Sequence, residues 1–287
     1  MVSARATGFV AKFAIVATLT LSPLSAAPAG AAAHTGTHEA HIVVTSSSGA
    51  ERLCNVTHPV ADEAPPFGVG PCPGVRPGAA VWSDGGGCTL NFMFTGYRQD
   101  GLGGLVEDAR FMGTAGHCIV DQSEQVHVWQ PGQGPEARDG NDVRIGEFAY
   151  AVNSSTKDFS LIRLDPGVNA NPQMCHFGGP TGLNDPNFTG SPGVIQHFGQ
   201  GLILGQTVSA RSGVGHLSDP NWQFATTAAI FGDSGSGVET EDGRAMGVLV
   251  AISPIGIVIT RLAPQIEPAR QALGLQSLEL QTAPELP

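Results

Sequence analysis

From residue 75 onward, the chain alternates short apolar runs with turns rich in glycine, proline and asparagine. Each run has the length of one strand, and this rhythm is typical of an antiparallel sandwich or barrel. Glycine (39 residues) and proline (21 residues) are abundant and only 14% of the residues are charged, which favours a turn-rich β protein over a helical one. The expected strands are residues 79–83, 89–95, 109–114, 125–129, 143–151, 158–164, 193–198, 202–209, 223–228, 236–240, 245–252 and 256–261.

A stretch without sustained periodicity, residues 166–191, separates these strands into two sets of six. It is rich in Asn, Pro and Gly, so we interpret it as a linker. Because a single core rarely grows far beyond about 250 residues, a chain of 287 residues has room for two small barrels. We therefore expect an all-β fold of two six-stranded antiparallel β-barrels, residues 75–165 and 192–275.

One C-terminal α-helix is expected at the end of the second barrel. Pro264 suits the first turn of a helix, and Gly274 suits its end. Between them, apolar residues recur at helical spacing: Ile266, Ala269, Ala272 and Leu273. Residues 276–287 are expected to form a loose tail.

Residues 1–33 have the pattern of an export signal. Arg5 and Lys12 give a positive start, an apolar stretch of about a dozen residues follows, and small alanines surround the expected cleavage within residues 27–33. A membrane helix needs roughly 20 apolar residues, so we expect a secreted, extracellular protein with no membrane segment once the signal is removed. Residues 34–74 are expected to be a pro-segment or an N-terminal extension.

The mature chain is acidic. Removal of Arg5 and Lys12 with the signal takes the formal net charge from −11 to −13. Nucleic acids and anionic lipid surfaces attract basic proteins, so this charge argues against both as partners.

A serine embedded in glycines follows the apolar run that ends at Phe231, in the sequence Gly232-Asp233-Ser234-Gly235-Ser236-Gly237. Glycines allow a tight turn that can aim several backbone N–H groups at one point beside the hydroxyl. An acyl-transfer enzyme needs such a point, because negative charge develops on the carbonyl oxygen in the transition state. The N–H groups of Gly232 and Ser234 are the expected donors of this oxyanion hole. The alternative is an ordinary Gly/Ser/Asp loop.

A serine nucleophile also needs a histidine base that is held by a carboxylate. His117 lies in Thr-Ala-Gly-His-Cys, directly after the expected strand 109–114, and Asp158 begins the run Asp-Phe-Ser-Leu-Ile-Arg-Leu. Either residue alone is more often structural than catalytic. Their occurrence together, in the order His, Asp, Ser, favours a catalytic triad of His117, Asp158 and Ser234.

These motifs resemble those of the chymotrypsin-family serine proteases, and most of all the short secreted bacterial members. TAGHC around His117, DFSLIRL from Asp158 and GDSGSG around Ser234 each match the family pattern at the residue concerned. The likeness extends over residues 75–273 and does not include the segment before them. It implies two chymotrypsin-like antiparallel barrels that meet at a cleft.

By this resemblance, Ser234 is the nucleophile, His117 is the general base and then the acid, and Asp158 holds the imidazole in its working tautomer. Asp233 is then a buried carboxylate next to the oxyanion hole, and its partner is either an arginine or a new N-terminus. The implied activity is hydrolysis of polypeptide substrates by a serine endopeptidase, through an acyl-enzyme. No cofactor is expected, a monomer is expected, and removal of a pro-segment would make the exported chain a zymogen.

Five cysteines in an exported chain indicate disulfides, and the odd number leaves one thiol over. No Cys-x-x-Cys or His-Glu-x-x-His spacing indicates a metal site. The resemblance implies a Cys88–Cys118 bridge that fixes the histidine loop. Two arrangements stay open for the other three cysteines: Cys175 joins an upstream cysteine, or Cys54 pairs with Cys72.

The expected specificity pocket carries no charge. Ala228, six residues before Ser234, stands where trypsin-like members have the aspartate that selects Lys or Arg. The strand around Val250 lacks the histidine of glutamate-selective relatives, and no cysteine brackets the pocket. With Gly256 as a third lining residue, the pocket is expected to prefer neutral, apolar side chains before the scissile bond.

Two other classes of function fit parts of the sequence. A catalytically inactive secreted binding protein would keep the fold and lose turnover, for example through a collapsed oxyanion loop. An esterase of the α/β-hydrolase type would need Gly-x-Ser-x-Gly on a strand-to-helix elbow and the chain order Ser, Asp, His. Here Ser236 replaces the second glycine and Ser234 comes last of the three, which disfavours the esterase.

Overall fold

The computed structural model describes residues 43–45, 51–53, 72, 74–188, 190–201 and 209–286. All of these belong to one compact unit, His41–Pro287. In its first part, β1 (Val43–Thr45) and β2 (Glu51–Leu53) pair as a two-stranded antiparallel ladder. The expected export signal and Cys54 lie outside the described residues.

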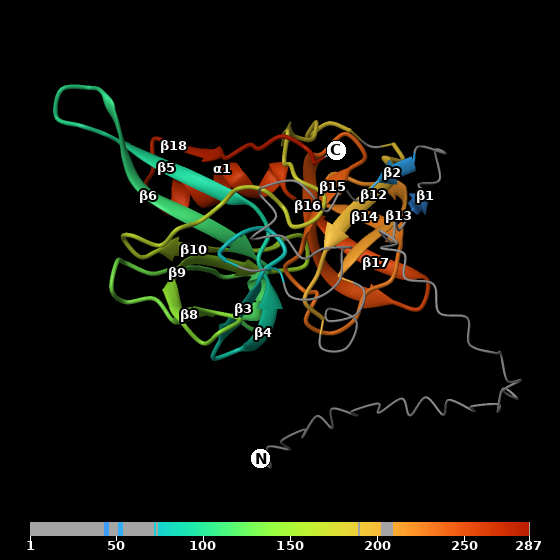
Figure 1. Cartoon of the computed structure of the whole chain (residues 1–287). Helices are drawn as coiled ribbons and strands as arrows, with labels where there is room; N and C mark the ends of the chain where they lie inside the picture. Colours follow the sequence, from blue (N-terminus) through green and yellow to red (C-terminus); the bar gives the residue numbers. More distant parts are fainter. Residues whose placement is uncertain are drawn as a thin grey trace, which may run out of the picture. The chain divides into compact units, whose positions relative to one another are not determined.

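The first large sheet has nine strands and contains a closed barrel (Figure 1). Its strands are β3 (Ala80–Ser83), β4 (Gly86–Thr89), β5 (Met93–Gln99), β6 (Leu105–Thr114), β7 (Val126–Val128), β8 (Glu136–Asp139), β9 (Arg144–Asn153), β10 (Asp158–Leu164) and β18 (Ser277–Leu280). β4 and β5 are consecutive parts of one bent segment, residues 86–99, which pairs first with β3 and then with β6. Since β3 also pairs with β8, the antiparallel path through β6, β10, β9 and β8 returns to β3 and makes a six-stranded barrel.

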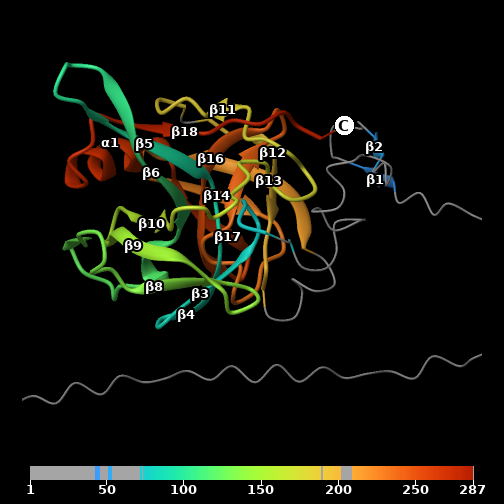
Figure 2. The ribbon, with the colours of Figure 1, turned by 60° about the vertical axis from the view of Figure 1, so that its left-hand side comes forward.

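The second large sheet forms a second six-stranded barrel, drawn mainly in orange in Figure 2. Its strands are β11 (Gly182–Leu183), β12 (Gly193–Phe198), β13 (Ala210–Ser218), β14 (Trp222–Thr226), β15 (Gly237–Thr240), β16 (Arg244–Ser253) and β17 (Gly256–Arg261). β16 pairs with both β15 and β17, so the six antiparallel strands β12 to β17 close on themselves, and β11 adds to β16 in parallel. The fold is thus the all-β double barrel that the sequence predicts.

Buried apolar side chains form two clusters that follow this division. The larger cluster fills the first barrel with aromatic rings such as Phe94, Phe111 and Phe159, and it continues into the second barrel through Phe198 and Val248. The smaller cluster lies within the second barrel and consists of Ile195, Ala225, Val238, Met246, Leu249, Ile257 and Ile259. Because the larger cluster draws on both sheets, burial of apolar area favours their association.

The helix α1 (Ala263–Ala272) is present as expected, and Gly274 follows it with a positive φ of 64° that glycine adopts without strain. The prediction of a loose tail after it is wrong at Ser277–Leu280, which forms β18 on the edge of β5. Leu278 is buried by this pairing. Four alternating residues are too few to distinguish such a strand from a loop by sequence pattern.

Every expected strand in the described ranges overlaps an observed one, and most of the expected strand 202–209 lies outside them. The sequence does not predict β8 or β13. β8 reads Glu-Ala-Arg-Asp, and β13 is rich in glycine, serine and charged residues. Neither has an apolar rhythm, and each exists because neighbouring strands offer hydrogen-bonding edges on both sides.

Candidate active site

His117 and Asp158 come together because their strands are neighbours. His117 lies in a single turn of 3₁₀ helix, Gly116–Cys118, that follows β6, and Asp158 is the first residue of β10, which pairs with β6. The Nδ1 atom of His117 lies 2.7 Å from Asp158 Oδ2, and the backbone N–H of His117 donates to Oδ1 at 3.0 Å. An ionised carboxylate only accepts hydrogen bonds, so the Nδ1 atom carries the proton in this contact and Nε2 is the ring nitrogen that points elsewhere.

Glycine is required in the turn before the imidazole. A Cβ atom at Gly116 would lie 1.9 Å from the carbonyl oxygen of Val152 on β9, which no side chain could accommodate. This close approach of the turn to β9 fixes the backbone from which the His117 side chain projects.

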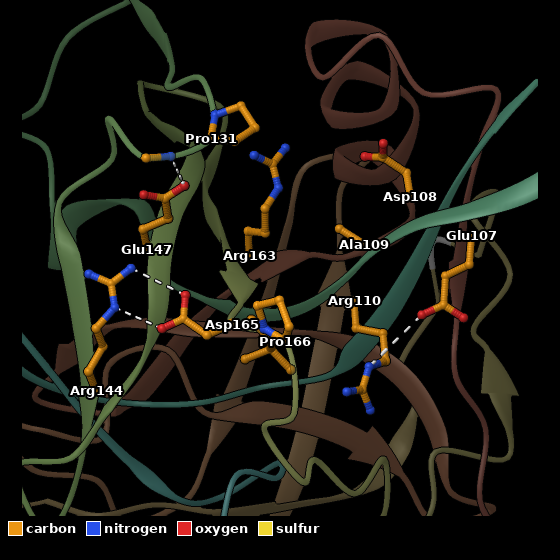
Figure 3. A pocket seen from close by; sticks show the side chains of 12 residues that line it. Glu107, Asp108, Ala109, Arg110, Pro131, Arg144, Glu147, Arg163, Asp165 and Pro166 are labelled. Carbon is orange, nitrogen blue, oxygen red and sulfur yellow. Dashed lines mark hydrogen bonds and ion pairs between the residues drawn. The ribbon is translucent and has the colours of Figure 1, made fainter.

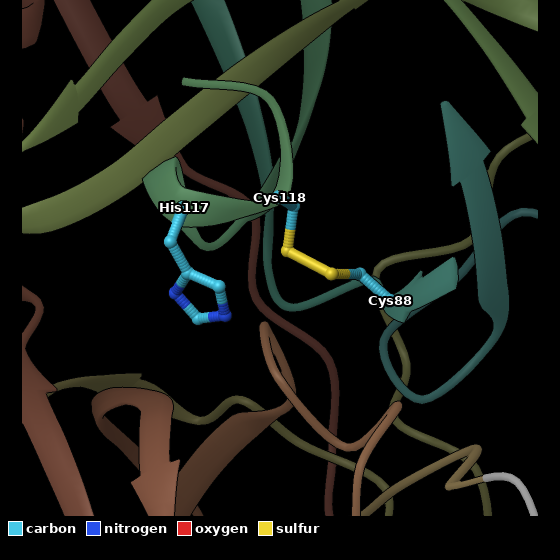
Figure 4. Close-up of side chains that lie close together, drawn as sticks. All are labelled: Cys88, His117 and Cys118. Carbon is cyan, nitrogen blue, oxygen red and sulfur yellow. A yellow bond between two sulfur atoms is a disulfide. The ribbon is translucent and has the colours of Figure 1, made fainter. Parts of the chain in front are cut away.

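A disulfide lies directly beside the His117 ring (Figure 4). Cys118 bonds to Cys88 at the end of β4, as the family resemblance implies, and so ties the histidine turn to the neighbouring hairpin. The two sulfur atoms and an imidazole nitrogen lie within 4.8 Å of one another. Both sulfurs are consumed in the disulfide, so they are not thiolates that could bind a metal ion here.

The second disulfide decides between the two arrangements that the sequence leaves open. Cys72 bonds to Cys175, which lies in the segment between the barrels. The segment before the first barrel is therefore tied covalently to the linker, 103 residues further along the chain.

The loop around Ser234 packs against the first barrel at the base of the histidine turn. Gly232 and Gly235 have positive φ values of 101° and 92°, which only glycine adopts readily. A Cβ atom at Gly235 would lie 2.1 Å from the Thr114 side-chain oxygen and 3.1 Å from the backbone nitrogen of Ala115. The residue after Ser234 is thus held against the end of β6, where the chain enters the histidine turn.

The N–H groups of Gly232 and Ser234 both belong to this loop. Neither has a hydrogen-bond partner among the residues that the structure describes, whereas the neighbouring N–H groups of Asp233, Gly235 and Ser236 all do. Within the same described ranges, the Ser234 hydroxyl donates no hydrogen bond to the His117 ring. Gly232 and Ser234 are both partly exposed, so their N–H groups are accessible to a bound anion or carbonyl oxygen.

Asp233 belongs to this loop and is fully buried; of the partners that the sequence leaves open for its carboxylate, the structure shows an arginine, Arg211 on β13. The carboxylate also accepts hydrogen bonds from the backbone N–H groups of Gly201 (2.8 Å) and Ile230 (2.7 Å). The arginine could not be singled out from the sequence, because β13 itself is not predicted. Arg211 stands out only once the structure is known, because it is a buried cation on a strand with few apolar residues.

His197 lies beside this ion pair and is completely buried. It pairs with Arg211 across β12 and β13. Burial lowers the pKa of His197 from 6.5 to about 4, although the nearby Asp233 charge acts in the opposite direction. The ring is therefore neutral at physiological pH.

The three residues expected in the specificity pocket lie in different surroundings. Val250 lines a pocket of about 450 Å³ together with His117, Asp158, Trp222 and Phe224. Gly256 lines another pocket, of about 590 Å³, with Ile255 and Ile257 among its walls, and Ala228 is exposed.

A third pocket, of about 520 Å³, lies at the opposite end of β10 from Asp158 and is lined by charges (Figure 3). Arg144 donates to both oxygens of Asp165, and Glu147 accepts from the backbone of Gly132 at 2.7 Å. The hydrogen bonds to Asp165 and Glu136 raise the pKa of Arg144 further above its usual range. Sequence reasoning gave no sign of this pocket, because its residues come from four separate segments.

No protein-family model matches the chain, and no curated protein matches it. Among solved structures, Alpha-lytic protease homolog N4 is similar, with a TM-score of 0.45 and 17% sequence identity. That match covers 70% of this chain and 97% of the other. So remote a likeness carries no information on activity, and the chemistry of the site has to come from its own side chains. None of the helices in the described ranges has the length and apolar character that crossing a membrane requires.

Proposed function

We propose that this chain is a serine endopeptidase with Ser234 as nucleophile, His117 as general base and Asp158 as the residue that orients the imidazole. One observation carries the proposal. A carboxylate-bound histidine and a glycine-flanked serine loop with two free N–H groups meet at the same end of the first barrel. A nucleophile, a base and an oxyanion site are the three parts that acyl transfer needs.

The proposed reaction has two halves. In the first, His117 Nε2 takes the proton of Ser234 as the hydroxyl oxygen bonds to the scissile carbonyl carbon. The carbonyl oxygen becomes an oxyanion that accepts hydrogen bonds from the N–H groups of Gly232 and Ser234. When the carbon–nitrogen bond breaks, His117 gives its proton to the leaving amine and an acyl-enzyme remains. In the second half, water repeats the same steps and releases the acid.

We also propose a preference for neutral, apolar side chains in the substrate. The described lining of the pocket beside His117 has an apolar side, Trp222, Phe224, Val250 and Val258, and an uncharged polar side, Gln122, Asn153, Ser154 and Ser155. Its one carboxylate, Asp158, is engaged by the histidine. The apolar side offers contact to apolar groups, and the pocket offers no free counter-charge to a cationic side chain. The proposed setting is extracellular, which two disulfides support because disulfides persist in oxidising compartments.

Covalent labelling with a fluorophosphonate probe tests the proposal. The native protein should be labelled and should hydrolyse a peptide substrate, and Ser234→Ala should abolish both. Asp158→Asn should lower kcat by about 10⁴-fold, because the imidazole loses its working tautomer. Ser277→Ala, which removes a partly exposed serine on β18, is the control and should behave like the native protein. Folded native protein that the probe does not label would instead indicate the inactive binding protein.

A further inference from the structure

Thr89 is a buried residue that joins the two barrels at the serine loop. It is the last residue of β4, directly after Cys88, and is completely buried. Its backbone N–H donates to the carbonyl of Ser234 at 2.8 Å, and its hydroxyl donates to the carbonyl of Gly232 at 2.8 Å. One residue of the first barrel therefore holds a carbonyl on each side of Asp233.

These two bonds fix the peptide units that enclose the proposed oxyanion site. The unit after Gly232 is held by Thr89 at its carbonyl, while its N–H, that of Asp233, donates to Ile230 at 3.0 Å. The unit after Ser234 is held by Thr89 at its carbonyl and by Leu249 at its N–H, at 2.8 Å. The intervening unit carries the Ser234 N–H. Its carbonyl, that of Asp233, accepts from the backbone N–H of Ser236 at 3.0 Å and from the Ser236 hydroxyl at 2.7 Å, and both neighbouring units are hydrogen-bonded as well.

The Thr89 hydroxyl also reaches the second barrel at another point. It accepts a hydrogen bond from the backbone N–H of Gln200 at 3.0 Å, and the next residue, Gly201, donates to Asp233. The hydroxyl thus uses its donor and its acceptor at once and links residue 200 to Gly232. Valine, which has nearly the same shape, could make neither bond, whereas serine could make both.

We propose that Thr89 is a positioning residue of this site, whose hydroxyl keeps the Gly232–Ser234 loop in the conformation that stabilises the oxyanion. The inference rests on the proposed function, since an oxyanion forms only if Ser234 attacks a carbonyl. It does not make Thr89 a catalytic residue, because the side chain touches the loop and not the substrate. Its loss should therefore act on the transition state more than on substrate binding.

Steady-state kinetics of Thr89→Val and Thr89→Ser test this. Loss of an oxyanion donor costs about a hundredfold or more in kcat, so misplacement of the loop by Thr89→Val should lower kcat by roughly tenfold to a hundredfold and change KM by less than about threefold. Thr89→Ser should restore kcat to within about threefold of the native value. The matched control is Thr260→Val, which removes another completely buried hydroxyl, one that accepts from Gln265 on α1. It should lower the Tm and leave kcat unchanged.

A second readout keeps the test independent of folding yield. A peptide boronic acid forms a tetrahedral adduct with a serine nucleophile, so its inhibition constant should weaken in Thr89→Val in parallel with kcat/KM. If Thr89→Val does not fold, Thr89→Ala takes its place and removes the hydroxyl together with the methyl group. The positioning role alone is overturned if the native protein is active and the variant without the hydroxyl, Thr89→Val or Thr89→Ala, keeps the native kcat. It is also overturned if that variant loses kcat and Thr89→Ser does not restore it. A native protein that neither hydrolyses peptides nor reacts with fluorophosphonate overturns the proposed function and the positioning role together.

Discussion

Two arginine–aspartate pairs in this chain differ in their exposure to solvent. Arg211 and Asp233 lie beneath the serine loop with side-chain exposures of 3% and 0%. Arg144 and Asp165 line the charged pocket at the far end of β10 with exposures of 42% and 37%. The Arg211–Asp233 pair therefore lies at the centre of the proposed site, whereas the Arg144–Asp165 pair borders open solvent.

The difference determines what each pair can do. Burial removes water from the Asp233 carboxylate, so its field is strong and loss of its partner is costly. The Asp233 carboxylate also accepts hydrogen bonds from the backbone N–H groups of Gly201 and Ile230, so it holds the backbone of two loops in place. At the exposed pair, water and salt screen the charges, and double-mutant measurements of such pairs give about 0–1 kcal/mol. Burial and backbone contacts, not the number of ion pairs, make a charge structurally important.

The largest expected effect comes from breaking the buried pair. Arg211→Met should lower the free energy of unfolding by about 3–5 kcal/mol, because it leaves the Asp233 charge buried and uncompensated. Peptide hydrolysis should fall as well, since Asp233 holds the backbone of the serine loop. Urea unfolding monitored by tryptophan fluorescence, together with fluorophosphonate labelling, measures both. The double variant Arg211→Met/Asp233→Leu should regain stability but not activity; equal stability of the single variant and native protein would show that the pair is not needed for folding.

The next largest expected effect is a pH dependence of stability that arises from His197, beside the buried pair. Because burial lowers the pKa of His197 to about 4, the unfolded chain binds a proton there between pH 6.5 and 4 while the folded chain does not. Stability should therefore fall as pH decreases through this window, by roughly 3 kcal/mol from this one group once pH is below 4. Chemical unfolding of native protein and of His197→Gln at pH 7.5, 5.5 and 4 isolates the contribution. A constant difference between the two proteins across these pH values would contradict it.

The smallest effect is expected at the exposed pair. Arg144→Gln should change the free energy of unfolding by no more than about 1 kcal/mol, and the change should shrink as salt is raised. Activity should stay at the native level, since the charged pocket lies at the end of β10 away from Asp158. Unfolding in 0.02 M and 0.5 M NaCl provides the measurement. A loss comparable to that of Arg211→Met would overturn the distinction between the two pairs.

Much of the double barrel could be predicted because its signals are local. A strand such as 158–164 shows its burial in its own apolar residues, and Gly232 to Ser236 indicate a tight turn by their composition. β8, β13 and β18 could not be predicted, since they are strands by virtue of the edges they join. Likewise, His117 and Asp158 were identifiable from their motifs, whereas Thr89 carries no motif and gains its contacts only from the packing of the barrels.

By itself, the sequence determined the alternation of strands and turns, most strands of the two barrels and the residues that could act as nucleophile, base and orienting acid. Only the tertiary structure decided that Arg211 faces Asp233, that Cys72 bonds to Cys175 and that Thr89 reaches Gly232. These partners are 22, 103 and 143 residues apart in the chain. No pattern in the sequence relates residues at such distances, because their contacts are formed only when each barrel closes and the two cores pack together.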